Sequence, residues 1–242
     1  MAILHGTQIT KTYFDIIGGF PPENKIFKEL SDYNGEKQLC VACTQLPCLA
    51  SERVFGVKGY SEKDQRRILK EWISFLETNP KALRALHFNS RVPQTLFDAA
   101  CHQDNLEELR FKWGAYSDLS ALENLNKLKF LYIGQGASVQ EITVLGNLKN
   151  LVVLHIEGFK KVEDFSPLTT LDNLEQLVIS GSINVKTPVK DLEFLRDMPN
   201  LRSFAIGNVS LRKKYTTEEL TNLRSALPNL HDINNCVAAY SK

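Results

Sequence analysis

The leucines of this chain recur at a nearly constant spacing through most of its length. Each one opens a short segment of the approximate pattern L-x-x-L-x-[I/F], for example LVVLHI at residues 151–156. The leading residues are Leu83, Leu106, Leu128, Leu151, Leu174, Leu201 and Leu230. Subtraction of successive positions gives spacings of 23, 22, 23, 23, 27 and 29 residues. Such a chain folds as a stack of similar units, because each unit buries its apolar side against its neighbours.

Each repeat contains a predicted strand followed by a predicted helical turn. Leu154 and Ile156 are separated by one residue, and the corresponding pairs of the other copies alternate in the same way. This period of two is typical of a strand with one buried face. Between strands a second apolar series steps mostly by three, as at Leu119, Leu122 and Leu125. That spacing predicts a helical or 3₁₀ turn packed on its own strand. Consecutive strands are therefore expected to be parallel.

The repeated pattern resembles the leucine-rich repeat family over about residues 81–235. The resemblance implies an α/β fold, a right-handed solenoid with a curved parallel sheet and short helical or 3₁₀ segments on its convex side. The family usually has Asn or Cys three residues after the last apolar strand position. Here that position has the residues Gly114, Gly136, Phe159, Ser182 and Val209. We therefore expect the usual asparagine ladder to be absent and the turns to differ.

The segment before the repeats has its own pattern and predicts an N-terminal α/β cap over residues 1–80. Ser61 and Asp64 form a helix-capping signature, and Pro80 follows the apolar helical pattern that ends near Asn79. Other predicted elements are a short helix at 23–32 and strands at 38–44 and 53–57. Residues 81–242 are predicted to form the repeat domain together with a C-terminal cap.

Charge and hydropathy exclude several classes of partner. The 29 basic and 28 acidic residues leave a net charge of +1, which favours neither nucleic acid nor an anionic membrane. No apolar run approaches the roughly 20 residues of a membrane span. The opening MAILHGTQITK has no secretory pattern. We therefore expect a cytoplasmic protein, and the two predicted caps favour a monomer.

Common catalytic motifs are absent from the sequence, which has no G-x-S-x-G, G-x-x-x-x-G-K-[S/T], H-E-x-x-H or G-x-G-x-x-G. His102, with Cys101 and Asp104 beside it, is interpreted as part of a loop between repeats. The basic run at 212–214 is interpreted as a solvated loop. The sequence therefore predicts no enzyme and no cofactor.

Five cysteines, an odd number, fit reduced thiols better than a disulfide framework. Cys40 and Cys43 form a C-x-x-C pair, and with Cys48 they leave open a thiol or zinc module. On a strand, however, Cys40 and Cys43 point to opposite faces. The favoured interpretation is that they are small core residues.

The strand pattern also predicts which side chains face away from the core. If Leu151, Leu154 and Ile156 point inward, the residues between them point to the concave side of the sheet and are exposed there. Applied to every copy, this rule predicts an aromatic and aliphatic patch with charged residues near it, bordered by a tryptophan. The predicted partner-binding residues are Arg110, Lys112, Trp113, Phe130, Tyr132, Val153, His155, Glu157 and Val178.

A large apolar anchor with charged neighbours has the composition of a binding hot spot. The alternative is that the N-terminal segment folds over this face and buries it. Our first hypothesis is therefore a non-enzymatic module that binds a protein or peptide on its concave face. One alternative is an inhibitor or immunity-type protein that occludes a target enzyme. The other is a thiol or metal module in residues 1–80, with the repeats as its scaffold.

Overall fold

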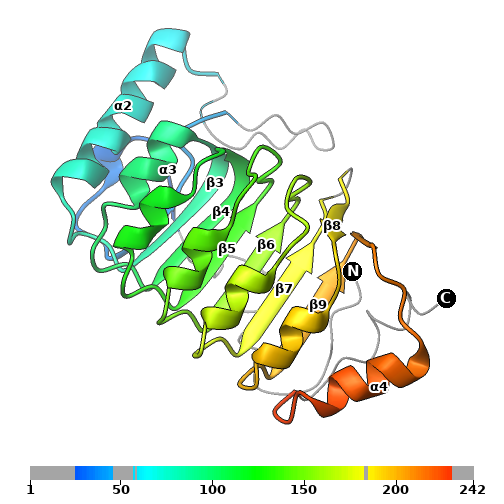
Figure 1. Cartoon of the computed structure of the whole chain (residues 1–242). Helices are drawn as coiled ribbons and strands as arrows, with labels where there is room; N and C mark the ends of the chain where they lie inside the picture. The colour runs from blue at the N-terminus through cyan, green and yellow to red at the C-terminus, as the bar shows by residue number, and fades with distance from the viewer. Residues whose placement is uncertain (1–24, 46–56, 58, 183–184, 231–242) are drawn as a thin grey trace.

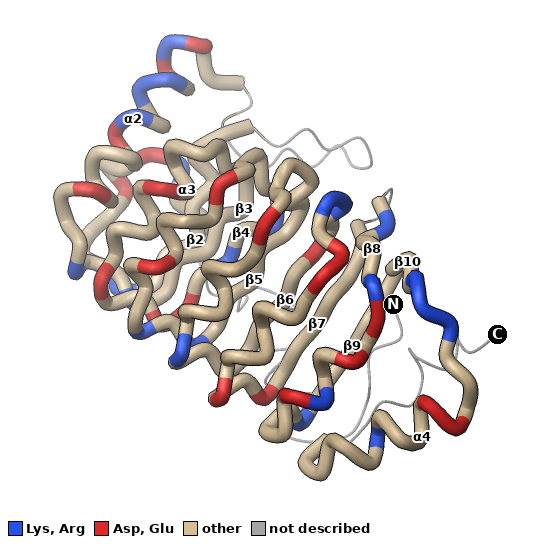
Figure 2. The backbone as a smooth tube through the Cα atoms, viewed as in Figure 1, with Lys and Arg blue, Asp and Glu red and all other residues tan. Residues whose placement is uncertain are grey.

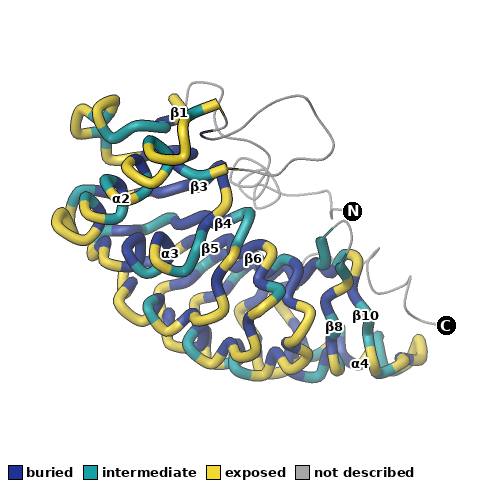
Figure 3. The backbone as a smooth tube through the Cα atoms, turned by 90° about the horizontal axis from the view of Figure 1, so that it is seen from above, coloured by how far each residue is buried: buried dark blue, intermediate teal, exposed yellow. Residues whose placement is uncertain are grey.

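A parallel sheet of eight strands runs through the computed structural model, which describes residues 25–45, 57, 59–182 and 185–230. The sheet bends along its length into a curved solenoid (Figures 1 and 3). Its strands, in spatial order, are β1 (Ile26–Phe27), β2 (Gln38–Val41), β3 (Ala85–Pro93), β4 (Glu108–Ala115), β5 (Phe130–Gly134), β6 (Val153–Glu157), β7 (Gln176–Ser180) and β9 (Ser203–Gly207).

Short helical segments cover one face of this sheet (Figure 1). They are α3 (Gln94–Ala100), η2 (Ser120–Asn124), η3 (Thr143–Asn147), η4 (Ser166–Thr170) and η5 (Glu193–Asp197), of which all but α3 are 3₁₀ turns. Inward side chains of strand and turn, such as Leu131 and Leu145, are fully buried in one continuous core. The predicted α/β solenoid with convex 3₁₀ segments is confirmed.

The described N-terminal residues add two strands and a helix to the first repeat. β1, the 3₁₀ turn η1 (Leu30–Asp32) and β2 lie where a short helix and a strand were predicted, so the predicted helix at 23–32 is wrong over Ile26–Phe27. The predicted helix that begins after Ser61 is confirmed as α2 (Glu62–Thr78). Its Trp72 is fully buried and donates a 2.9 Å hydrogen bond to the Lys28 carbonyl.

The sheet continues without a break from β2 into β3, across the predicted domain boundary at residue 80. The division into 1–80 and 81–242 therefore stays a prediction. The predicted strand at 53–57 and the end of the C-terminal cap, after Leu230, lie outside the described residues, apart from Val57.

Asparagine side chains do link several successive repeats, but they precede the strands instead of following them. The usual position, three residues after the last apolar strand residue, has no asparagine, as expected, and the amide instead precedes the leading leucine. Each side chain donates to a backbone carbonyl of the preceding repeat, and the pairs are Asn105 to Lys81 (3.3 Å), Asn150 to Asn126 (2.6 Å), Asn173 to Lys149 (2.8 Å), Asn200 to Asp172 (2.8 Å) and Asn229 to Pro199 (2.9 Å).

At the other end of the strands, Gly114, Gly136 and Phe159 stand where the family usually has asparagine. A methyl group at Gly136 would overlap the ring of Phe159 in the next repeat, so only glycine fits there. Tyr116 is buried and donates a 3.0 Å hydrogen bond to the Gly134 carbonyl. Gln135 adopts a left-handed conformation, with φ of 55°, as the chain leaves β5.

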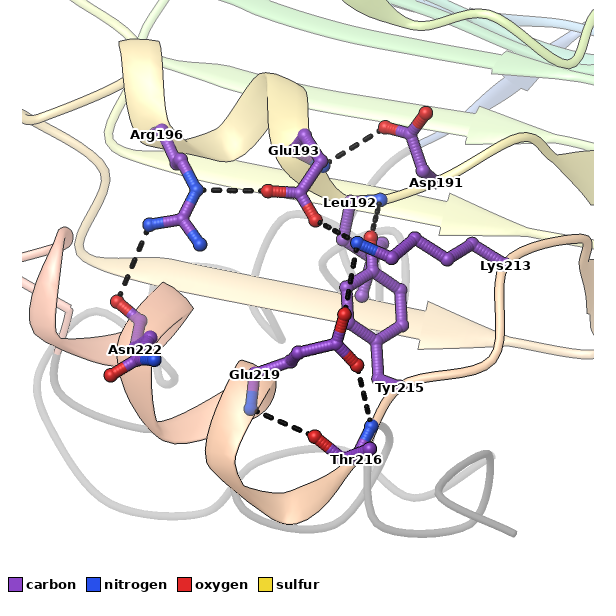
Figure 4. A network of polar contacts seen from close by, with 9 residues as sticks. All are labelled: Asp191, Leu192, Glu193, Arg196, Lys213, Tyr215, Thr216, Glu219 and Asn222. Atoms are coloured by element: carbon purple, nitrogen blue, oxygen red, sulfur yellow. Dashed lines mark hydrogen bonds and ion pairs between the residues drawn. The ribbon is translucent and has the colours of Figure 1, made fainter.

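Polar contacts attach the C-terminal cap to the last repeat (Figure 4). β8 (Thr187–Val189) and β10 (Val209–Leu211) pair outside the main sheet, and α4 (Thr217–Ser225) follows. Lys213 donates to Glu193 at 2.7 Å, and the Tyr215 hydroxyl accepts a 2.7 Å bond from the Leu192 N–H. Thr216 and Glu219 form a capping box that begins α4.

We predict that Asn173→Ala lowers the free energy of unfolding by about 1 kcal/mol, because the Lys149 carbonyl loses its partner from the next repeat. Urea denaturation followed by circular dichroism measures the change. Asn147→Ala is the control, since Asn147 lies exposed on a neighbouring turn and makes no side-chain bond within the described residues. Equal midpoints for the two variants would contradict a stabilising ladder.

Candidate functional site

The concave side chains lie in the predicted columns. Tyr132 pairs with His155 across β5 and β6, and His155 pairs with Val178 across β6 and β7. The Tyr132 and His155 rings stack with their centroids 4.4 Å apart. Phe130, Tyr132, Val153 and Val178 form a hydrophobic cluster separate from the main core, so they face away from it as predicted. We call these four residues and His155 the concave patch.

The concave patch is not exposed, and the prediction that it faces solvent is wrong. The exposed fractions are 4% for Phe130, 2% for Tyr132, 5% for Val153, 3% for His155 and 7% for Val178. Within the described residues, these side chains pack against one another across β5, β6 and β7, with Val152 and Ala205 beside them. Burial of apolar surface stabilises a fold by about 25 cal/mol per Å². The sequence pattern indicates which way a side chain points, but not whether water reaches it.

Polar side chains surround the concave patch, and Arg110 and Ser180 are buried with it. Arg110, which is 5% exposed, lies with its guanidinium carbon 5.1 Å from the centroid of the Tyr132 ring. The Tyr132 hydroxyl donates a hydrogen bond to the Glu157 carboxylate. His155 Nε2 and Ser180 Oγ are 2.9 Å apart. The strands therefore carry a connected row of ring, cation and carboxylate contacts across three repeats.

Burial also shifts the titration of these groups. It lowers the pKa of His155 to about 3, with further contributions from the positive charges of Arg110 and Lys112. Burial raises the pKa of Glu157, although the Tyr132 hydrogen bond opposes that shift. Burial likewise lowers the pKa of Arg110. His155 is therefore neutral at pH 7.

Three of the predicted binding residues remain partly accessible, namely Lys112, Trp113 and Glu157. Lys112 Nζ lies 5.1 Å from the centroid of the Trp113 ring. β3 and β4 contain 9 and 8 residues, against 5 in β5, and a register shift between Phe88 and Arg91 pairs Arg91 with Trp113. This longer strand pair carries the tryptophan past the ends of the following strands.

Arg91 is a surface residue that the repeat pattern missed. It is exposed beside Trp113, but it lies beyond the irregularity in β3, where counting along the repeat no longer predicts which residues are neighbours. In the sequence, the one sign of this residue is an arginine that follows shortly after the repeat segment at 81–88. His87 lies beside Arg110 on the neighbouring strand, and its Nε2 lies 2.5 Å from Glu108 Oε1.

The cysteines lie where core residues are expected. Cys40 is 1% exposed and Cys43 is 0% exposed, and only Cys43 belongs to the main core, in agreement with opposite faces. Burial raises the pKa of both thiols to about 12. In the part of the chain that the structure describes, no group of three or more His, Cys, Asp or Glu side chains could bind a metal ion. Cys48 lies outside that part.

We predict that His155 makes the protein less stable in mild acid. Unfolded, its imidazole binds a proton below about pH 6.5, whereas the folded group stays neutral down to about pH 3. The contribution of the neutral His155 side chain to the free energy of unfolding is therefore complete above pH 6.5 and is lost as the pH falls. Between pH 7 and pH 5 the loss is about 2 kcal/mol.

The measurement is the free energy of unfolding of the native protein and of His155→Gln at both pH values. Between pH 7 and pH 5, the free energy of unfolding of His155→Gln should decrease by about 2 kcal/mol less than that of the native protein. His102→Gln is the matched control, because it makes the same substitution at an exposed histidine. An NMR titration of the folded protein in which His155 protonates near pH 6.5 would refute the assignment.

The structure was compared with known proteins. No family model and no curated protein matches the chain. Among solved structures, internalin C2 from Listeria monocytogenes is 20% identical over 64% of this chain and 71% of its own, with a TM-score of 0.49. A second internalin from that species is 24% identical over 64% of this chain and 49% of its own, with a TM-score of 0.46.

A leucine-rich repeat protein of Leptospira interrogans is 18% identical over 62% of this chain and 48% of its own, with a TM-score of 0.43. The chain thus spans about half the length of two of these proteins. Among the helices within the described ranges, none is long and apolar enough to cross a membrane. The leucine-led repeats, the parallel strands in register and the 3₁₀ turns on one face give this chain the leucine-rich-repeat fold.

Proposed function

We propose that the chain is a non-enzymatic protein-binding module that contacts its partner at the accessible end of the concave face, around Trp113. The single observation that supports this is the partly exposed tryptophan on the elongated β3–β4 pair, between Arg91 and Lys112. Tryptophan and arginine are the residues most enriched among interface hot spots. An indole presented beside two cations offers an apolar anchor with a polar surround.

In this proposal, the buried residues of the predicted binding set hold the accessible side chains in place. Arg110 packs against Tyr132, and Tyr132 donates to Glu157, which is itself partly exposed. Side chains that packing fixes lose little entropy when a partner binds. Direct contact is therefore assigned to Lys112, Trp113 and Glu157. The supporting role is assigned to Arg110, Phe130, Tyr132, Val153, His155 and Val178.

The other hypotheses have less support. A thiol or metal module needs reactive or convergent cysteines, whereas Cys40 and Cys43 are buried and lie on opposite faces. An inhibitor that occludes an enzyme would use the same surface, and a tight, stoichiometric complex would distinguish it from a transient adaptor. A cytoplasmic, monomeric protein stays a prediction.

We predict that Trp113→Ala weakens partner binding by at least about 2 kcal/mol, or roughly thirtyfold, the usual threshold of an interface hot spot. The tagged protein and its variant are used to capture partners from the native cell under identical conditions. Quantitative mass spectrometry identifies proteins that the native chain retains and the variant loses, and titration of the purified candidate measures the affinity.

The control is Thr143→Ala, which changes an exposed residue on the convex turn η3. It should leave capture unchanged. Both variants must keep the circular dichroism spectrum and the unfolding midpoint of the native protein. A partner retained equally by Trp113→Ala and the native chain would overturn the assignment of this surface.

A further inference from the structure

The two edges of the sheet carry their charges differently. At the edge where the strands begin, ion pairs link successive repeats. Arg84 and Lys129 both contact Glu107, at 2.9 Å and 3.0 Å, and Arg202 contacts Glu175 at 3.3 Å. Glu107 accepts hydrogen bonds from both cations, which lowers its pKa to about 2. Positive and negative groups alternate there, so that edge carries little net charge.

The edge where the strands end carries cations that form no ion pair within the described residues. We call it the carboxyl edge, formed by Arg91, Lys112, Lys160, Lys161 and Lys186. All of them except Lys112 are exposed, and none lies within ion-pair distance of a carboxylate in the residues that the structure describes. Basic residues are visible on the loop after β6 and close to β8 (Figure 2). Of the two glutamates closest in sequence to Lys160 and Lys161, Glu157 is hydrogen-bonded to Tyr132 and Glu163 pairs with Arg212 at 3.3 Å.

A hollow runs along the carboxyl edge, and of the five cations named above Arg91 lines it. Its lining extends from Arg91 through Gly114, Gln135 and Gly158 to Val185, next to Lys186. Small residues form much of this lining, so that a partner's backbone can approach the loops closely. Five strands, β3 to β7, end along it. With neighbouring strands about 4.8 Å apart, the hollow spans about 19 Å, which is the length of roughly six residues of extended chain.

We propose that the partner presents an acidic, extended segment that lies along the carboxyl edge, with carboxylates at Arg91, Lys160, Lys161 and Lys186 and an apolar side chain on Trp113. This inference rests on the proposed function and names the chemistry of the partner. A run of unpaired cations attracts a segment of opposite charge and sets its orientation. Burial of the Trp113 ring against the partner then adds to the affinity, and salt does not screen this apolar contact.

A polypeptide fits this edge better than a nucleic acid does. The whole chain carries a net charge of only +1, whereas nucleic-acid binding draws on many phosphate contacts and a broad positive field. Single-stranded nucleic acid also stacks successive bases on several aromatic side chains. Trp113 is the one partly exposed aromatic side chain that the described residues place at this edge. The test must therefore distinguish binding of an acidic peptide from binding of an oligonucleotide.

The test uses the full chain and a fluorescein-labelled peptide of about ten residues, in which glutamate alternates with serine around one central leucine. A matched peptide has glutamine in place of glutamate, and a single-stranded DNA of similar length serves as the third probe. Fluorescence polarisation measures binding to the native protein and to the triple variant Lys160→Glu, Lys161→Glu, Lys186→Glu. The control triple variant, Lys37→Glu, Lys63→Glu, Lys70→Glu, has the same net charge at exposed sites elsewhere.

We predict that the glutamate peptide binds the native chain and the control variant, and that the carboxyl-edge variant binds it at least about tenfold more weakly. Binding should also weaken as salt shortens the screening length from about 10 Å at 0.1 M to about 3 Å at 1 M. No binding to the native protein, equal binding of the glutamine peptide, equal losses in the two triple variants, or tighter binding of the DNA would each overturn the inference.

The same variants separate this inference from the proposed function. A partner lost by Trp113→Ala but retained by the carboxyl-edge variant would leave the binding surface in place and refute an acidic segment. A partner that Trp113→Ala retains would refute the assignment of the binding surface around Trp113, whether or not the glutamate peptide binds.

Discussion

Each strand of this sheet obtains its backbone hydrogen bonds from the repeats on either side, and the rest of the structure depends on that pairing. Strands of about five residues contribute too few contacts to persist alone, so stability comes from the stack. The same pairing places residues 22 or 23 positions apart side by side, as with Tyr132 and His155. Anything that keeps successive repeats in register therefore also shapes the surface that they share.

Two devices maintain the register at opposite ends of the strands. Amides such as those of Asn150 and Asn173 bond to the preceding repeat where a strand begins. Where a strand ends, a ring such as that of Phe159 packs over a glycine of the previous repeat. The family pattern usually puts its asparagine at that second place. An aromatic ring occupies more volume than an amide, so only a residue without a side chain fits beneath it, as at Gly136.

Local periodicity was enough to predict the solenoid, its 3₁₀ turns and the direction of each strand side chain, because a period of two or three depends on backbone geometry alone. It was not enough to predict exposure. His155 points away from the main core as expected and is nevertheless buried. The pairing of Arg91 with Trp113 was equally hidden, since it follows an irregularity that breaks the count between β3 and β4. Properties that depend on contacts between distant residues leave little trace in a repeat pattern.

The division of charge between the two edges follows from where the repeats can neutralise each other. At the start of the strands, Glu107 lies between Arg84 and Lys129 of adjacent repeats and contacts both, and Glu175 contacts Arg202 of the next repeat. At the carboxyl edge the loops differ in length and conformation, and glycines and aromatic rings occupy their bases. No alternating column of charges forms there, so Lys160 and Lys186 remain exposed. A solenoid stabilised by contacts between repeats can thus leave one edge available to a partner, because its stability does not depend on the charges at that edge.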